Sequence, residues 1–336
     1  MKQALLALAA VIPLAAEVHT VYASKFWNSF HNRHPVLKRV RPGDSVATRT
    51  IDASGLDEKG ASVAQGPNPL TGPFFIEGAE PGDAIHVRFD RIRMNRNMGW
   101  TRYRLGAYAV TPESMEKTYP ASYRKGAAVP GRDELLPWDL DLAKGTVKLR
   151  EPTSKAVKFE FPARPMLGCV GVAAQGDFGP SSGISGTYGG NMDYNEVVEG
   201  STVMLPVYHQ GALLFIGDGH ALQADGEPTG TGIETSMDVS FTVTLRKRAN
   251  LPGPRLENAE FIVAIGSQPE FVSSLDRTLR VATSDMVHWL TSEYGLEPWA
   301  AHQLIGYQGK YDVITVGGSM GLRIPKKHLP ARRERQ

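Results

Sequence analysis

The chain contains one cysteine, Cys169, among its 336 residues. A single cysteine cannot form an internal disulfide and offers no redox motif. Cys169 lies in the apolar run 167–174, which favours a small buried side chain over a catalytic nucleophile. The formal net charge is only +2, and no dense basic stripe occurs before residues 326–335. We therefore expect no nucleic-acid partner, because nucleic-acid binding usually needs a concentrated basic surface.

Long apolar runs are also missing, apart from one near the N-terminus. Residues 4–16 are apolar, follow Lys2, and precede cleavage points after Ala16 or Ala23. The run is shorter than the roughly 20 residues of a transmembrane helix, and it is typical of a secretory signal peptide. We therefore expect residues 1–23 to be a leader, and the mature chain to be periplasmic or secreted, with no membrane segment. An N-terminal core strand or a retained anchor is the alternative.

Glycine and proline are abundant, with 35 and 23 residues, which favours many turns and short strands. Alternating apolar residues predict half-buried strands between these turns. The strands are expected over residues 45–50, 84–89, 157–161, 203–207 and 239–245. Residues 91–151 have weaker periodicity, and we expect an insertion or loop layer between sheets there. The chain is thus predicted to be mainly β up to about residue 270.

The pattern changes after residue 270. Apolar residues recur at steps of three and four over 272–294, which predicts a helix with Gly295 after its C-terminus. A second short helix is expected over 298–305 and a strand over 311–316. Residues 271–336 are therefore predicted to be a mixed αβ portion.

The segment from Gly189 to Glu234 holds the densest group of candidate functional residues, in three glycine-led clusters. Their oxygen and imidazole groups suit metal binding or proton transfer. The members are Asn191, Asp193, Asp218, His220, Asp225, Glu227 and Glu234. Solvated turns also collect Gly, Asp and Asn. That interpretation explains one such cluster easily and three in succession poorly.

Two pairs in these clusters have the same spacing. Asp218 and His220 are two residues apart, as are Asn191 and Asp193, so in extended backbone each pair shares a face. Together they would offer a mixed nitrogen and oxygen site for zinc or another divalent ion. Asp193, Asp218 and His220 are the predicted ligands. The alternative is that the two aspartates cap turns and His220 binds backbone in the core.

Other residues are candidates for proton transfer and substrate binding. Glu234 precedes an apolar strand, and burial would raise its carboxylate pKa, so it is the predicted general acid/base. A salt bridge at a strand end is its alternative role. Glu227 and His34 are further catalytic candidates, although lone histidines are more often surface or core groups. Asn191 and Gly190 are predicted to contact substrate.

Several long motifs occur in one order along the chain. They are residues 70–83 (LTGPFFIEGAEPGD), 165–173 (PMLGCVGVA), 189–193, 205–207, 211–212, 217–227, Glu234 and 293–296. These motifs resemble those of the acetamidase/formamidase family, and the resemblance runs from about residue 34 to 325. Ala224 stands where the family usually has glycine, and residues 91–151 align poorly.

The resemblance makes residues 24–336 one catalytic region. It implies a jelly-roll-type β-sandwich with a smaller β-barrel part and an αβ C-terminal portion. It also implies hydrolysis of a small linear carboxamide to a carboxylate and ammonia, often in a homo-oligomer. Some members contain zinc or calcium, and no organic cofactor is expected.

Other functions remain open at this stage. An exported, non-catalytic jelly-roll module that binds carbohydrate or metal is one alternative, and a hydrolase of a cyclic or larger amide is another. The dense carboxylates favour an enzyme. No Gly-x-Ser-x-Gly elbow is present, which disfavours serine hydrolysis.

Overall fold

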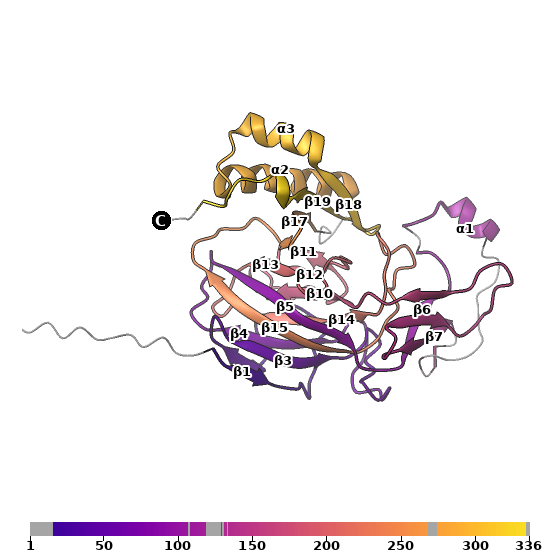
Figure 1. Ribbon diagram of the computed structural model, residues 1–336. Helices are drawn as coiled ribbons and strands as arrows, with labels where there is room; N and C mark the ends of the chain where they lie inside the picture. The colour runs from indigo at the N-terminus through magenta and orange to yellow at the C-terminus, as the bar shows by residue number, and fades with distance from the viewer. Residues whose placement is uncertain are drawn as a thin grey trace, which may run out of the picture.

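The computed structural model describes residues 16–106, 108–118, 129, 131–132, 134–267 and 274–333. Strands dominate these residues and form three sheets (Figure 1). The mainly β fold predicted from the sequence is therefore confirmed. The predicted leader lies outside the described residues as far as residue 15, whereas residues 16–23 are described.

The largest sheet has nine strands and joins the N-terminal and C-terminal parts of the chain. Its order is β1 (Val18–Thr20), β3 (Ser45–Thr50), β15 (Met237–Arg246), β5 (Ala84–Met94), β13 (Thr202–Pro206), β16 (Arg255–Glu257), β17 (Phe261–Gly266), β19 (Ser319–Pro325) and β18 (Lys310–Thr315). Buried and partly exposed residues alternate in β3 and β15, as expected for strands with one face on the core.

The second sheet has six strands, two of which carry Gly190, Asn191, Asp218 and His220. Its order is β11 (Ser185–Gly186), β12 (Gly189–Asn191), β10 (Met166–Val172), β14 (Leu214–His220), β4 (Leu70–Ile76) and β2 (Lys38–Val40). All seven residues of β10 and of β14 are buried. The rings of Phe74 in β4 and Phe241 in β15 pack 5.2 Å apart, which joins the two sheets through one core.

The third sheet projects from one side of the molecule (Figure 1). It contains β6 (Met98–Arg102), β7 (Leu135–Asp141), β8 (Thr146–Leu149) and β9 (Glu160–Pro162), in that order. Most of the expected insertion over 91–151 is therefore a small sheet, accompanied by the short helix α1 (Pro112–Thr118). The implied β-barrel part is not found in the described residues, because β6 and β9 do not pair to close this sheet.

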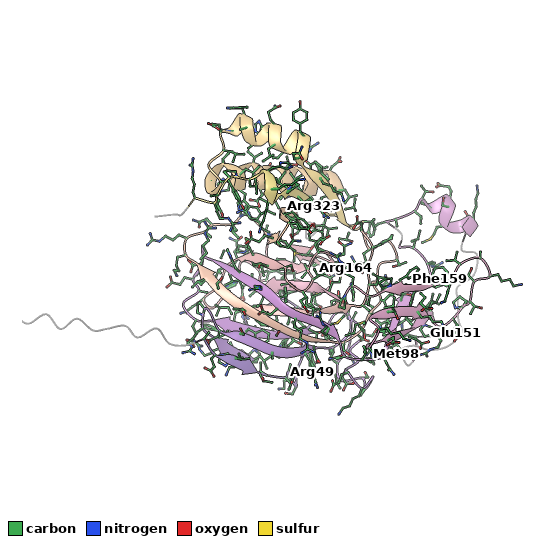
Figure 2. All side chains as sticks on the ribbon, viewed as in Figure 1. Arg49, Met98, Glu151, Phe159, Arg164 and Arg323 are labelled. Carbon is green, nitrogen blue, oxygen red and sulfur yellow. The ribbon has the colours of Figure 1, made fainter. Side chains whose placement is uncertain are left out.

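The strand predicted over 157–161 is also corrected. Only β9 forms there, and the side chains of Val157, Phe159 and Phe161 are 52%, 38% and 37% exposed. The alternation therefore marks no buried face, since β9 is the outer edge of the small sheet. Figure 2 shows Phe159 on this side of the molecule, far from Arg323 in β19.

The C-terminal portion is mixed αβ, as predicted. Helix α2 (Leu275–Glu293) covers β17 and β19 of the nine-stranded sheet, and α3 (Pro298–Gln308) packs on α2 and against β19 (Figure 1). A 3₁₀ turn, η1 (Lys326–His328), lies near the C-terminus. Gly295 adopts φ +70°, the left-handed conformation of a residue that follows a helix. The buried Arg255 in β16 binds Asp285 of α2, with nitrogen–oxygen distances of 2.8 and 2.6 Å. No helix among the described residues is long and apolar enough to cross a membrane.

Candidate active site

A cavity of about 810 Å³ lies beside β14, and five of the predicted site residues line it. These five are Asn191, Asp193, Asp218, Glu227 and Glu234. His220, which is fully buried, lies directly behind them. The structure therefore brings together the three predicted metal ligands and two of the three predicted catalytic residues.

Three segments position these side chains. The end of β14 carries Asp218 and His220, and His220 forms a backbone bridge with Glu234. Glu234 is also held by Trp100 in β6, through backbone hydrogen bonds of 2.9 and 3.2 Å. The backbone N–H of Asp193 donates to the carbonyl of Gly168 in β10 (3.1 Å). The small sheet and the six-stranded sheet thus meet at the site.

His220 is the centre of the cluster. Its Nε2 atom lies 3.1 Å from Oε1 of Glu234 and 3.5 Å from Oδ1 of Asp218. Asp218, His220 and Glu234 place one candidate ligand atom each within 4.8 Å of one another, and so do Asp193, His220 and Glu227. Both groups therefore share the imidazole.

Four buried atoms in this cluster form no hydrogen bond within the described part of the chain. They are Oδ1 of Asp193, Oδ1 of Asp218, Nε2 of His220 and Oε2 of Glu234. Each unsatisfied buried polar atom costs about 1–3 kcal/mol, so a partner shared by these four atoms would stabilise the cluster. A divalent cation accepts this combination of imidazole nitrogen and carboxylate oxygen. The residues present therefore fit a metal ion.

The charges of these groups perturb one another. Burial raises the pKa of Asp193 and of Glu234 well above the usual value, and nearby carboxylates raise both further. Burial also raises the pKa of Glu227, to about 7. Burial alone would lower the pKa of His220, but the carboxylates of Glu234 and Asp218 raise it well above its usual value. The cluster is thus short of positive charge, which a bound cation would supply.

Gln223, which sequence analysis missed, fixes the orientation of His220. Its Oε1 atom accepts a hydrogen bond from Nδ1 of His220 (2.7 Å), and its Nε2 donates to the backbone carbonyl of Asp193 (2.6 Å). Because an amide oxygen can only accept, Nδ1 carries the proton and Nε2 faces the carboxylates. Such partners orient metal-binding histidines in proteins. The sequence feature that could have identified Gln223 is its position three residues after His220 in the same motif.

For a zinc ion held by this cluster, Gln223→Leu is expected to weaken binding by about 10–100-fold, the usual effect of losing a partner behind a metal ligand. The side chain keeps its approximate size but can neither accept from His220 nor donate to Asp193. Zinc titration of the metal-free protein against a competing chelator measures the change. Gln303→Leu, an exposed position on α3, is the matched control. Equal affinities in the two variants would contradict this role.

Asn68 is a second residue that sequence analysis missed. Its Nδ2 donates to Oδ1 of Asn191 (2.8 Å) and to Oδ2 of Asp218 (3.2 Å). Asn191 in turn donates from Nδ2 to Oδ2 of Asp193. The amide of Asn191 is therefore engaged by its neighbours inside the site. Asn68 stands just before the 70–83 motif, and that place in the chain was its one sequence signal.

Cys169 lies at the base of the same network. Its thiol donates to Oδ1 of Asn191 at 2.8 Å and is fully buried. Burial, aided by the nearby carboxylate of Asp218, raises the pKa of the thiol well above its usual value. Cys169 is therefore held as a neutral thiol, which fits the buried structural role predicted for it.

Three other candidates lie apart from the cluster. His34 stacks on Trp27, with ring centroids 4.3 Å apart, and its Nε2 lies 2.9 Å from the hydroxyl of Ser29. Gly190 pairs with Val170 in the sheet ladder and does not line the cavity. Asp225 accepts a hydrogen bond from Asn195 on the surface (2.8 Å). None of these three lines the cavity beside β14.

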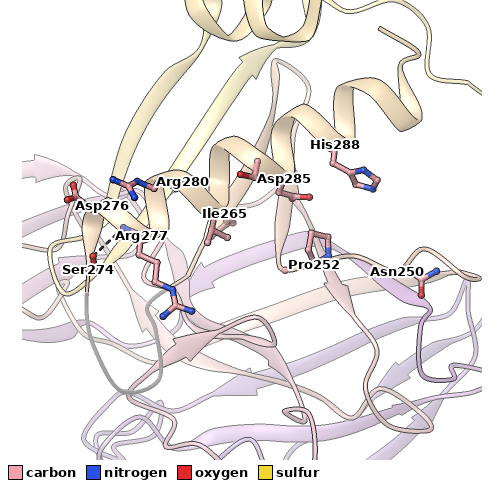
Figure 3. A pocket seen from close by; sticks show the side chains of 12 residues that line it. Asn250, Pro252, Ile265, Ser274, Asp276, Arg277, Arg280, Asp285 and His288 are labelled. Atoms are coloured by element: carbon pink, nitrogen blue, oxygen red, sulfur yellow. Dashed lines mark hydrogen bonds between the residues drawn. The ribbon is translucent and has the colours of Figure 1, made fainter. Parts of the chain in front are cut away.

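A second cavity, of about 690 Å³, lies beside α2 (Figure 3). Its lining includes Arg277, Asp285 and His288 but none of the predicted site residues. Asp285 is already bound to Arg255. This second cavity is therefore separate from the cluster around His220.

Comparisons with known proteins find similarity to acetamidases and formamidases. A sequence model described as the acetamidase/formamidase family matches residues 182–283, which contain most of the cluster. The chain is similar to an acetamidase structure from Yersinia enterocolitica, with 27% identity, 95% of each chain covered and a TM-score of 0.77.

Two curated relatives are formamidases by name. The chain is 24% identical to a putative formamidase of Schizosaccharomyces pombe, over 65% of this chain and 62% of that protein. It is also 24% identical to a formamidase of Methylophilus methylotrophus, over 66% of this chain and 64% of that protein. The match thus spans less than two thirds of the length of either relative.

Proposed function

We propose that this chain is a hydrolase of small linear carboxamides. The comparisons confirm its resemblance to the acetamidase/formamidase family. The proposed enzyme cleaves a carbon–nitrogen bond that is not a peptide bond and releases a carboxylate and ammonia. One observation carries the proposal. Four buried atoms without a hydrogen bond lie together on Asp193, Asp218 and Glu234, which line a cavity, and on His220 directly behind them.

Asp193, Asp218 and His220 would hold a divalent ion at that point. The imidazole nitrogen among carboxylate oxygens suits zinc better than calcium, which prefers oxygen ligands alone. Such an ion lowers the pKa of water and polarises a carbonyl oxygen, which are two of the requirements of amide hydrolysis.

Glu234 is the proposed proton carrier. It lines the cavity, and backbone bonds to Trp100 hold it beside His220. Its carboxylate takes a proton from the attacking water and returns it to the departing nitrogen, so that amide and water give acid and ammonia. Glu227, whose pKa is raised to about 7 by burial, is the alternative carrier on the same wall.

Other residues shape the substrate end of the cavity. Leu56 and Trp100 belong to a small apolar cluster that lines it. An acyl group would pack there while its amide faces the carboxylates. The cavity volume of about 810 Å³ exceeds the needs of formamide, and this favours testing larger and cyclic amides beside the smallest ones.

The apolar run over 4–16 supports the further proposal that the chain is exported through removal of a leader. A homo-oligomer also stays a prediction. Size-exclusion chromatography with light scattering on the exported protein tests the oligomer.

The deciding experiment is ammonia release from formamide, acetamide, propionamide and a lactam, with metal analysis of the same sample. We expect turnover of at least one linear amide, loss of that turnover on chelation, and its return on addition of zinc. No turnover of any amide by folded, metal-loaded protein would overturn the hydrolase. Turnover of the lactam alone would overturn the linear substrate class. Full activity in protein shown to be metal-free would overturn the role of the ion.

A further inference from the structure

The first described residues form part of the largest sheet. Strand β1 pairs in parallel with β3, and Val18 lies opposite Ser45. The N–H of Ser45 donates to the carbonyl of Glu17 (2.9 Å), and that of Val21 donates to Ala47 (3.0 Å). Residues 17–21 are therefore integrated into the folded chain, although they lie inside the segment 1–23 that was predicted to be a leader.

A buried carboxylate receives the backbone nitrogen at the start of this segment. The N–H of Glu17 lies 2.9 Å from Oδ1 of Asp44, whose side chain is 3% exposed. Nε of Arg41 donates to the other oxygen of Asp44 (3.0 Å), and Nε2 of His19 lies 3.1 Å from it. Asp44 thus ties the first residues of the strand to the turn before β3.

The two predicted cleavage points have opposite consequences for this arrangement. Cleavage after Ala23 would remove β1, and with it the contacts of Glu17 and His19 to Asp44. The buried carboxylate would then keep Arg41 as its one charged partner among the described residues. Cleavage after Ala16 would keep every contact of residues 17–23. It would also convert the N–H of Glu17, already at Asp44, into a cationic amine.

We propose that a leader peptidase cleaves the bond between Ala16 and Glu17, and that the new α-ammonium group of Glu17 binds the carboxylate of Asp44. Water supplies a hydroxyl group to the carbonyl carbon of Ala16 and a proton to the nitrogen of Glu17. A second proton from solvent gives the ammonium form. Ala16 is a small residue, as leader peptidases require before the cut, and both residues are exposed.

Local charge supports the same bond. With His19 neutral, the two carboxylates around it, those of Glu17 and Asp44, share one cation, the guanidinium of Arg41. The new ammonium would supply a second cation, and a charge-assisted hydrogen bond is stronger than the amide contact that it replaces. Glu17, His19 and Asp44 also have the geometry of a metal group, but Arg41 already occupies the oxygen of Asp44 that faces His19.

The inference rests on the proposed export, and one measurement separates the two. The full chain is expressed in a host that exports it, and the exported protein is examined by intact mass and N-terminal sequencing. We expect the mature chain to begin at Glu17. An exported chain that begins at Ser24 would overturn this inference and leave export standing. An exported chain that keeps residues 1–16 would likewise overturn the inference alone, whereas a chain that keeps them and is found only inside the host cell would overturn both.

A second measurement tests the ammonium–carboxylate bond in the mature chain. Isotopic methylation and NMR give the pKa of the α-amine, which is about 7.7–8.0 in an unperturbed chain. We expect a higher value, because Asp44 stabilises the charged form. Asp44→Asn should return the pKa to its ordinary range, and Asp177→Asn, at an exposed ion pair with Arg33, should not. An ordinary pKa in the unaltered mature chain would overturn the bond even if Asp44→Asn fails to fold.

Discussion

His220→Ala is expected to lower amide hydrolysis by more than about 100-fold, because loss of a ligand costs more than loss of the groups behind it, which typically cost 10–100-fold. His220 is the single residue shared by both groups of candidate ligands. Its removal leaves the carboxylates of Asp193, Asp218 and Glu234 without a nitrogen donor. The proposed ion should therefore be lost together with the activity.

Three readouts make this prediction specific. Ammonia release gives kcat/KM, elemental analysis gives the metal content, and circular dichroism shows whether the sheets persist. His302→Ala, an exposed histidine on α3, is the matched control and should retain activity and metal. Asp193→Ala should act in the same direction as His220→Ala. Near-normal rates in both variants would remove these residues from the site.

Much of the fold follows from local patterns. Strands β3 and β15 were predictable because one face of each is buried, which leaves an alternation in the sequence. Helix α2 was predictable because it buries one stripe against β17 and β19. The small sheet was not, because β7 buries most of its residues on both faces and shows no clean alternation. The apolar residues around β9 led to the opposite error. They alternate in the sequence, although their side chains are not buried in a core.

The residues of the site differ in the same way: those within one local motif were predictable, and those far apart in the chain were not. Asp193, Asp218, His220 and Glu234 belong to compact motifs, so residue type and spacing were enough to suggest them. Asn68 is separated from Asp218 by 150 positions in the chain, and no local pattern links the two. Only the three-dimensional arrangement of the strands shows that such a residue lies in the site.

His34 illustrates the opposite case, a predicted site residue that the structure places away from the cluster. Residue type made it a candidate for catalysis, but an imidazole ring also packs well against an aromatic one. The structure stacks it on Trp27 and places its Nε2 beside the hydroxyl of Ser29. A histidine outside a dense polar motif therefore carries little functional information by itself.

Gly168→Ala is expected to abolish most of the activity without removing a single donor atom. A Cβ at this position in β10 would stand 2.3 Å from Oδ1 of Asp193 and 2.6 Å from Oδ2 of Asp218. Neither carboxylate can keep its place, because heavy atoms do not approach so closely. We expect metal affinity and kcat/KM each to fall by more than about 100-fold, as for loss of a ligand. Overpacking should also destabilise the fold by about 1–3 kcal/mol.

The control is Gly306→Ala on α3, where an added Cβ would meet no heavy atom within 4 Å. It should preserve activity and stabilise the helix by up to about 1 kcal/mol. Zinc titration, ammonia release and thermal unfolding of both variants measure the difference. If Gly168→Ala bound zinc and turned over amide like the unaltered protein, Asp193 and Asp218 could not act together on one ion. Because the variant keeps every charge of the site, a loss of affinity would instead show that the close approach of β10 holds the two carboxylates in place.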